Sequence, residues 1–168
     1  MRPSALTRTW LGWGLLCGLP LLVADQWLKR LVVQTFSLND GLSCWSGYLQ
    51  FMYVRNPGLA FGLLQRVPTV WRSWLFLGLT ALALGVIVAM LWRAAKFSRL
   101  LQAVITLISA GAVGNLIDRF VCGAVIDFMV LRLGNVSLPA FNLADFYIVL
   151  GLCGLVVHSW LDTDGIGF

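Results

Sequence analysis

The sequence predicts an all-α membrane protein, a bundle of four transmembrane helices that carries a small extracytoplasmic β-sheet. Of its 168 residues, 60% are hydrophobic and only 11% are charged. A soluble domain has about 45–50% apolar and about 25% charged residues. Several uncharged stretches approach or reach the roughly 20 residues that a helix needs to cross a bilayer. These observations exclude an ordinary soluble domain, a disordered chain, a coiled coil and a free nucleic-acid binder.

The four predicted spans cover about residues 9–30, 73–92, 100–118 and 145–161 of a single domain, 1–168. The second and third spans contain uncharged windows long enough to cross a bilayer by themselves. The windows of the first and fourth are shorter and reach that length only together with the residues next to them. The first continues past its aspartate because the following turns keep one helical face apolar. It is interpreted as a retained helix, because the leucine at the −3 position of the only candidate cleavage site is too large for a signal peptidase.

The basic residues near the predicted spans indicate the orientation of the chain. Two arginines precede the first span, and the short link 93–99 carries three basic residues. Short basic segments stay on the cytoplasmic side. Both termini are therefore expected inside, with extracytoplasmic segments at about 31–72 and 119–144. Basic residues within 25–72 oppose this orientation, but long loops carry less weight.

The first extracytoplasmic segment has the pattern of a small sheet. Residues 48–54 are rich in strand formers, and Asn56, Pro57 and Gly58 form a strong turn signal. Residues 59–64 are expected to return as a second strand. We therefore expect a sheet that lies on the membrane surface.

Acidic side chains next to hydrocarbon point most directly to chemistry, because a carboxylate at the bilayer centre costs about 2.5–3.5 kcal/mol. All seven acids are aspartates, and five of them fall on the predicted outer side. Among these five, Asp127 and Asp145 have no adjacent lysine or arginine. Two carboxyls in a poorly solvated site cannot both ionise cheaply, so one keeps a proton and the pair separates into an acid and a base. Such a pair can direct the attack of water on an amide.

Three of the aspartates, Asp145, Asp118 and Asp40, also have a simpler structural interpretation. Asp145 is expected at the start of a helix, where aspartate is a favoured cap. Asp118 is adjacent to Arg119 and would form an ion pair or end a helix, and Asp40 would lie in a solvated turn. The single histidine, His158, is more typical of a packed or interfacial residue, and no metal site or cofactor is expected.

Two other functions remain open from the residues alone. A small proton-coupled transporter would use the same acids as a relay, distributed through the depth of the membrane. A non-catalytic assembly factor would use segment 25–72 for docking and would tolerate asparagine at positions 127 and 145.

Five ordered motifs carry a resemblance that extends over nearly the whole chain. The motifs are residues 25–29 (DQWLK), 56–61 (NPGLAF), 111–119 (GAVGNLIDR), 125–128 (VIDF) and 141–145 (FNLAD). In this order they resemble those of the lipoprotein signal peptidases, the signal peptidase II family of bacterial aspartic endopeptidases. The second motif departs from the family, which more often has Thr and Ala where Pro57 and Leu59 stand here. Proline removes a hydrogen-bond donor at that point.

The resemblance implies a role for each matching residue. Asp127 and Asp145 would be the catalytic dyad. The substrate site would be lined or shaped by Asn56, Gly58, Asn115, Arg119, Asn142 and Ala144. Supporting positions would be Asp25, Lys29 and Asp118.

The resemblance also implies a substrate and a location. The substrate would be a prolipoprotein with diacylglycerol on its lipobox cysteine, cleaved just before that cysteine. The sheet and a surface helix would cradle the lipidated peptide, and globomycin would block the site. The chain would act as a monomer without cofactor, metal or nucleic acid in the bacterial cytoplasmic (inner) membrane, with its active site near the extracytoplasmic face.

Overall fold

The structure is a computed structural model that describes residues 5–57 and 98–163. Between these ranges it describes six single residues, each in helical conformation: Trp71, Gly78, Leu82, Gly85, Val86 and Ala89. The rest of the predicted span 73–92 lies outside the described residues, as do Gly58 and the predicted strand 59–64.

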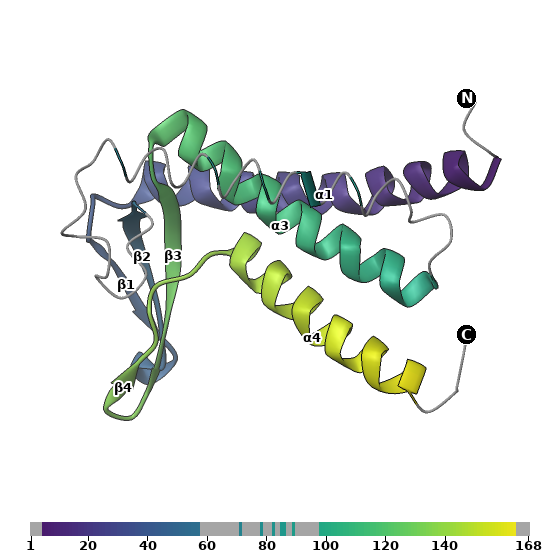
Figure 1. Ribbon diagram of the computed structural model, residues 1–168. Coiled ribbons are helices and arrows are strands. Elements are labelled where there is room, and N and C mark those ends of the chain that lie inside the picture. The colour runs from purple at the N-terminus through teal and green to yellow at the C-terminus, as the bar shows by residue number, and fades with distance from the viewer. Residues whose placement is uncertain are drawn as a thin grey trace.

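Three long helices make up the helical layer of the described residues: α1 (Ala5–Thr35), α3 (Arg99–Cys122) and α4 (Leu143–Thr163). α3 packs against both α1 and α4. The beginning of α1 and the end of α4 lie at the end of this layer that is remote from the sheet (Figure 1). Among the described helices, Arg99–Cys122 and Leu143–Leu161 are long and apolar enough to cross a membrane.

Both ends of α3 carry capping residues. The Ser98 hydroxyl accepts the Leu101 N–H at 3.2 Å, which satisfies one free amide of the first turn. At the other end Gly123 has φ 70°, a left-handed conformation that glycine adopts without steric cost, and its N–H donates to the Arg119 carbonyl. The chain therefore turns sharply and enters the sheet two residues later.

A four-stranded antiparallel sheet lies across one end of the helices (Figure 1). In spatial order its strands are β1 (Gly41–Cys44), β2 (Leu49–Asn56), β3 (Val125–Leu133) and β4 (Val136–Ser137), and the 3-10 turn η1 (Trp45–Gly47) joins the first two. The strand predicted at 48–54 is confirmed as β2. Its neighbours are β1 and β3, two strands that were not predicted from the sequence.

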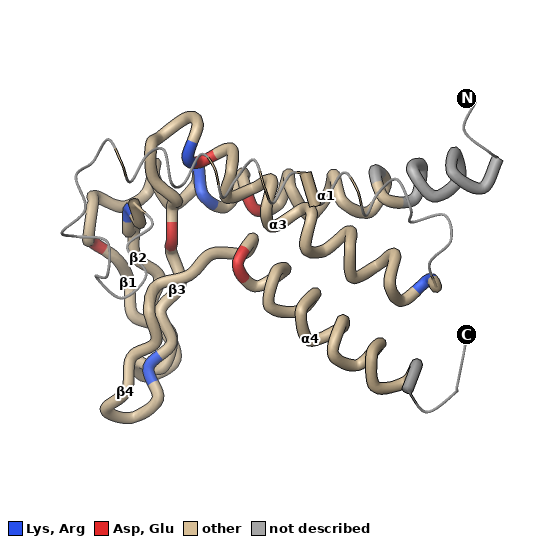
Figure 2. The backbone as a smooth tube through the Cα atoms, in the orientation of Figure 1, with Lys and Arg blue, Asp and Glu red and all other residues tan. Residues whose placement is uncertain are grey.

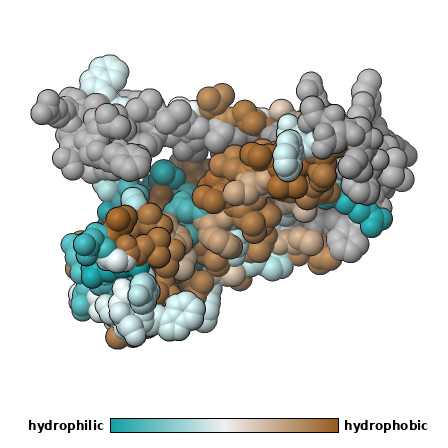
Figure 3. Space-filling model, turned by 90° about the horizontal axis from the view of Figure 1, so that it is seen from below, coloured by the Kyte–Doolittle hydropathy of each residue, from teal (hydrophilic) through white to brown (hydrophobic). Residues whose placement is uncertain are grey.

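The core beneath the sheet is apolar. Val32 of α1 packs with Tyr53 of β2 and with Ile126 and Phe128 of β3, all buried. The outer faces of the helices, by contrast, expose large aliphatic side chains such as Leu16, Leu19, Val23, Leu152 and Val156. In Figure 3 hydrophobic residues dominate the helical part of the visible face, and hydrophilic residues gather toward the sheet. Extended exposed apolar surface of this kind marks contact with a membrane or with another apolar partner.

The predicted fold class is supported only in its coarser features. Long apolar helices and a small sheet are present, as expected. The four-stranded sheet forms a substantial second part of the described structure, so the all-α class is not confirmed. The count of four spans is not confirmed either, because most of residues 73–92 is not described.

Candidate active site

Asp127 is the third residue of β3, and its side chain is almost completely buried. Its Oδ1 accepts a hydrogen bond from Asn142 Nδ2 at 2.7 Å, and its Oδ2 accepts one from Asn56 Nδ2 at 2.9 Å. The residue as a whole is 1% exposed. The carboxyl is thus fixed by an amide on each oxygen, one from the neighbouring strand and one from the turn before α4.

A bulge in β2 brings Asn56 to the face of the sheet that carries Asp127. The register pairs Phe51 with Met129 and then Val54 with Asp127, so β2 has one extra residue between these pairs. Paired residues share a face, and so do residues two apart along a strand. Asn56 therefore lies on the Asp127 face, whereas a regular ladder would place Arg55 there.

Asp145 belongs to the first turn of α4 and forms a capping box with Asn142. The Asn142 Oδ1 accepts the Asp145 N–H at 2.8 Å, and the Asp145 Oδ2 accepts the Asn142 N–H at 3.2 Å. Such reciprocal bonds satisfy two amides at a helix start. The other oxygen, Oδ1, accepts from Asn115 Nδ2 of α3 at 2.7 Å. Asp145 therefore takes part in capping as the third residue of α4, whereas the N-cap itself is Asn142, and its carboxyl lies in the same polar cluster as Asp127.

Asn142 connects the two carboxyls. Its side-chain amide donates to Asp127 and, at 3.0 Å, to Asn115 Oδ1, while its backbone and its Oδ1 engage Asp145. Asn142 is completely buried and Asn115 is 7% exposed. One residue thus holds a carboxyl of β3 and a carboxyl of α4 on the two sides of a shared hydrogen-bond network.

The pKa of Asp127 is raised to about 6, well above the usual value for aspartate. Burial is the main cause, because it disfavours the charged form, and the negative charge of Asp145 acts in the same direction. The hydrogen bonds from Asn56 and Asn142 partly oppose this effect. Asp127 is thereby prepared to hold a proton at a pH where an ordinary aspartate is ionised.

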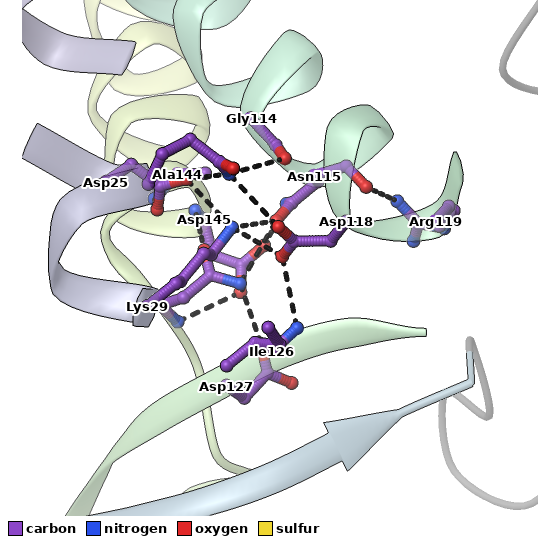
Figure 4. Close-up of polar contacts among 12 residues, drawn as sticks. Asp25, Lys29, Gly114, Asn115, Asp118, Arg119, Ile126, Asp127, Ala144 and Asp145 are labelled. Carbon is purple, nitrogen blue, oxygen red and sulfur yellow. Dashed lines mark hydrogen bonds and ion pairs between the residues drawn. The ribbon is translucent and has the colours of Figure 1, made fainter. Parts of the chain in front are cut away.

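A second group of charges lies directly behind the two acids. Lys29 of α1 forms ion pairs with Asp25 and Asp118, each at 2.8 Å, and donates to Asn115 Oδ1 at 3.1 Å (Figure 4). Lys29 is 1% exposed, and both aspartates are buried. Gln26 adds hydrogen bonds to Asp118 at 3.0 Å and to Asp25 at 3.3 Å. The lysine charge is therefore compensated inside the protein rather than at the membrane surface.

Two glycines of α3 allow the other helices to approach this cluster. A methyl group at Gly111 would overlap with the backbone carbonyl oxygen of Ala144 in α4. A methyl group at Gly114 would lie 2.7 Å from the Asp25 carboxylate. Small residues at such positions permit close contact between helices, and they bring the start of α4 against α3.

Comparisons with known proteins find relatives over most of the chain. The model of the signal peptidase (SPase) II family matches residues 18–161. The chain is 43% identical over 143 residues to the lipoprotein signal peptidase of Nostoc punctiforme, covering 83% of this chain and 84% of that protein. It is 38% identical over 137 residues to the lipoprotein signal peptidase of Syntrophus aciditrophicus, covering 82% and 85% respectively.

The chain belongs to the signal peptidase II family. As a member of this family it is a peptidase that removes signal peptides. The predicted resemblance is confirmed.

Solved structures show the same fold. Two structures described as bacterial membrane enzymes, determined by the in meso method at 1.9 Å and 2.3 Å resolution, are each 27% identical to this chain. Their TM-scores are 0.77 and 0.80. The first match covers 88% of this chain and 92% of the other, and the second covers 92% and 91%. This signal peptidase II family member is therefore a membrane enzyme.

The structure brings most of the residues predicted for the site into one cluster. Asn56, Asn115, Asn142 and both proposed catalytic acids share the network described above. Ala144 takes part through its backbone, which donates to Asp25 Oδ1 at 2.9 Å. Gly58 lies outside the described residues.

The contacts of Asp118 and Arg119 differ from the ion pair that their adjacency in the sequence predicts. Asp118 forms its ion pair with Lys29 of α1, and Arg119 Nη1 donates to the Asn115 carbonyl oxygen at 3.1 Å. Sequence reasoning also missed Gln26 and the backbone amide of Ile126, which donates to Asp118 Oδ2 at 3.1 Å. The signal for Gln26 was its place inside the first motif. A backbone amide leaves no signal in a sequence.

The remaining predicted side chains have the surroundings expected for structural residues. Asp40 is exposed in a turn, where its carboxylate accepts the Gly41 N–H at 2.8 Å. His158 is partly buried, and its Nε2 lies 3.1 Å from Ser98 Oγ. Across the described part of the chain, no group of three histidine, cysteine or acidic side chains is arranged to hold a metal ion.

Proposed function

We propose that this chain is an aspartic endopeptidase that removes signal peptides from lipid-modified prolipoproteins, cleaving just before the lipidated cysteine, with Asp127 and Asp145 as its catalytic pair. The observation that carries this proposal is the contact of Asn142 with both carboxyls. A buried and a partly buried acid joined in this way have the groups needed for water-mediated hydrolysis of an amide.

The environments of the two acids support different roles. Asp127 is the neutral acid, because burial raises its pKa to about 6. Asp145 lies in the first turn of α4, where its Oδ1 accepts a hydrogen bond from Asn115 Nδ2 and its Oδ2 accepts one from the Asn142 N–H. Asp145 would take a proton from water while that water attacks the scissile carbonyl carbon. Asp127 would donate its proton to the carbonyl oxygen.

Collapse of the tetrahedral intermediate then completes the reaction. The carbon–nitrogen bond breaks, and the leaving nitrogen receives a proton from the pair. The products are a signal peptide with a new carboxylate and a lipoprotein whose cysteine carries a free amine. The proton given to the nitrogen comes from Asp145, which is again a carboxylate, and a hydroxyl of the collapsing intermediate returns a proton to Asp127.

The position of the acids supports a substrate that is held in the bilayer. Most of the aspartates gather where the helices meet the sheet (Figure 2), and Asp162 lies in the last turn of α4, at the remote end. A proton-coupled transporter would distribute acids through the membrane, so this clustering favours the peptidase. The sheet lies beside the acids, and the exposed aliphatic faces of the helices suit acyl chains and a signal helix. Arg119 and Asn56 would contact the peptide backbone.

The substrate class is tested by comparing two precursors. Purified protein in lipid is given a prolipoprotein that carries diacylglycerol on its lipobox cysteine, or the same precursor with that cysteine replaced by serine. We expect a gel shift only for the lipidated precursor, and globomycin is expected to block it. Equal cleavage of both precursors, or no cleavage of the lipidated one, would contradict the proposal.

We further infer that the enzyme lies in the bacterial inner membrane as a multi-pass monomer with both ends of the chain in the cytoplasm. This inference rests on the basic link 93–99 and on the common end that the start of α1 and the end of α4 share (Figure 1). A cysteine introduced at Phe97 should be protected from an impermeant thiol reagent in intact cells. Labelling at that position from outside would reverse the orientation.

A further inference from the structure

The residues that precede the two proposed catalytic acids are held in the same way. Ile126, just before Asp127, donates its backbone N–H to Asp118 Oδ2 at 3.1 Å. Ala144, just before Asp145, donates its backbone N–H to Asp25 Oδ1 at 2.9 Å. A buried carboxylate therefore anchors the backbone one residue ahead of each acid.

A single ammonium group joins these two anchors. Lys29 Nζ lies 2.8 Å from Asp25 Oδ2 and 2.8 Å from Asp118 Oδ2. Its third hydrogen bond, at 3.1 Å, goes to Asn115 Oδ1, and the amide nitrogen of Asn115 donates to Asp145. An ammonium has three donors, and all three are used toward groups that lead to the acids.

We propose that Lys29 is a positioning residue that sets the separation of Asp127 and Asp145 by tying the backbone before each acid to one buried ammonium through Asp25 and Asp118. This inference rests on the proposed function, because it concerns the geometry of that catalytic pair. Lys29 itself touches neither acid through any described hydrogen bond. Its positioning effect passes through the start of β3 and the start of α4, in addition to the direct effect of its charge, which opposes the rise in the pKa of Asp127.

The cost of burying these charges supports a geometric role. Removing a lysine and two carboxylates from water is expensive, and such groups often stabilise a fold no better than apolar side chains would. The arrangement instead links three helices and one strand at fixed hydrogen-bond lengths. Gly114 shows how close the packing is, because a side chain there would meet the Asp25 carboxylate. Misplacing a catalytic group by about 1 Å can cost about 100-fold in rate.

The test replaces Lys29 by methionine, which keeps much of the length and removes the charge. With the lipidated prolipoprotein we expect Lys29→Met to lower kcat about 100-fold and to leave KM unchanged, because the groups proposed to contact the peptide remain. The backbone amides of Ile126 and Ala144 should also exchange their hydrogens faster in the variant. A role limited to stability would change neither kcat of the folded enzyme nor these two amides.

A pair of variants keeps the test informative if Lys29→Met does not fold. Asp25→Asn retains a carbonyl oxygen that can accept the Ala144 N–H, whereas Asp25→Ala removes the acceptor. We expect kcat to fall more in Asp25→Ala than in Asp25→Asn. Equal kcat in these two variants and the wild type would overturn the proposal.

Val104→Ala is the matched control for loss of stability. Val104 is buried on α3 against Gly154 of α4, about 16 Å along the helix from Asn115. This variant should melt at a lower temperature with its kcat unchanged. If Lys29→Met keeps the wild-type kcat, or loses activity only in proportion to unfolded protein with both amides still protected, Lys29 does not position the pair. Failure of the wild type to cleave would instead refute the proposed function.

Discussion

Replacing Asp127 or Asp145 by asparagine is expected to abolish cleavage of the lipidated prolipoprotein, lowering kcat by about 1,000-fold or more. Asparagine has nearly the same size as aspartate, but it can neither take a proton from water nor donate an acidic one. Each oxygen of the two carboxyls accepts a hydrogen bond from an amide N–H, so asparagine keeps the size of the side chain and leaves one of these donors without its acceptor. A gel-shift assay with purified variants in lipid measures the effect.

Asp40→Asn provides the control for this substitution. Asp40 is an exposed aspartate of the same end of the molecule, and its carboxylate only accepts the Gly41 N–H of its own turn. Its activity should equal that of the wild type. Wild-type activity in both Asp127→Asn and Asp145→Asn would refute the aspartic mechanism and would favour the non-catalytic assembly factor.

The pH dependence of stability tests the raised pKa of Asp127, with Asp127→Asn as the reference that lacks the titrating group. The folded-state pKa of Asp127 is about 6, whereas an ordinary aspartate has a pKa of about 3.9. Its carboxyl therefore contributes stability that is fully present below about pH 4 and is lost as the pH rises to about 6. Relative to Asp127→Asn, the wild type should lose up to about 3 kcal/mol over that range. Thermal melts of both proteins from pH 4 to pH 7 measure this difference, and parallel curves would contradict the buried placement of Asp127.

Substituting Asn142 by aspartate is expected to lower kcat by about 100-fold or more while the protein stays folded. Aspartate is as good a helix cap as asparagine, so the start of α4 should keep its bond to the Asp145 N–H. The amide that donates to Asp127 at 2.7 Å would become an oxygen. A third carboxyl beside the pair disfavours ionisation of its neighbours, so the division into one acid and one base would be lost.

The variant Asn142→Ser distinguishes the effect of the added carboxylate from the effect of losing the side-chain amide that donates to Asp127. Serine also caps helices well, but its side chain is too short to reach Asp127 and adds no charge. We expect a smaller loss of kcat for Asn142→Ser than for Asn142→Asp, with similar melting temperatures for both variants. Cleavage by Asn142→Asp at the wild-type rate would show that the bridge between the acids has no role in catalysis.

The sequence alone identified the catalytic candidates because their physical setting is local. A carboxylate in an apolar run with no basic neighbour, as at Asp127, is unusual whatever the fold. The run 48–54 was correctly predicted as a strand, since strand propensity is also a local property. The long apolar windows likewise predicted the helices α3 and α4, and the ordered motifs predicted the family.

The partners of these residues could not be predicted, because each one comes from a distant element. Their adjacency in the sequence suggested an ion pair between Asp118 and Arg119. Adjacent side chains of a helix point in different directions, however, and α3 directs Asp118 toward Lys29 of α1. The bulge that exchanges Arg55 for Asn56 on the Asp127 face depends on the pairing of β2 with β3, which no pattern in either strand specifies.

The sequence by itself determined which residues are the candidates for hydrolysis, because charge, hydropathy and motif order belong to the chain. Only the tertiary structure decided that Asn142 joins the two acids and that one lysine ammonium anchors the backbone before each of them. Such contacts form only where α1, α3, α4 and β3 come together in the folded protein, because a hydrogen bond needs its donor and acceptor within about 3 Å of each other. Two of them involve backbone amides, which every residue except proline possesses and which a sequence therefore cannot single out.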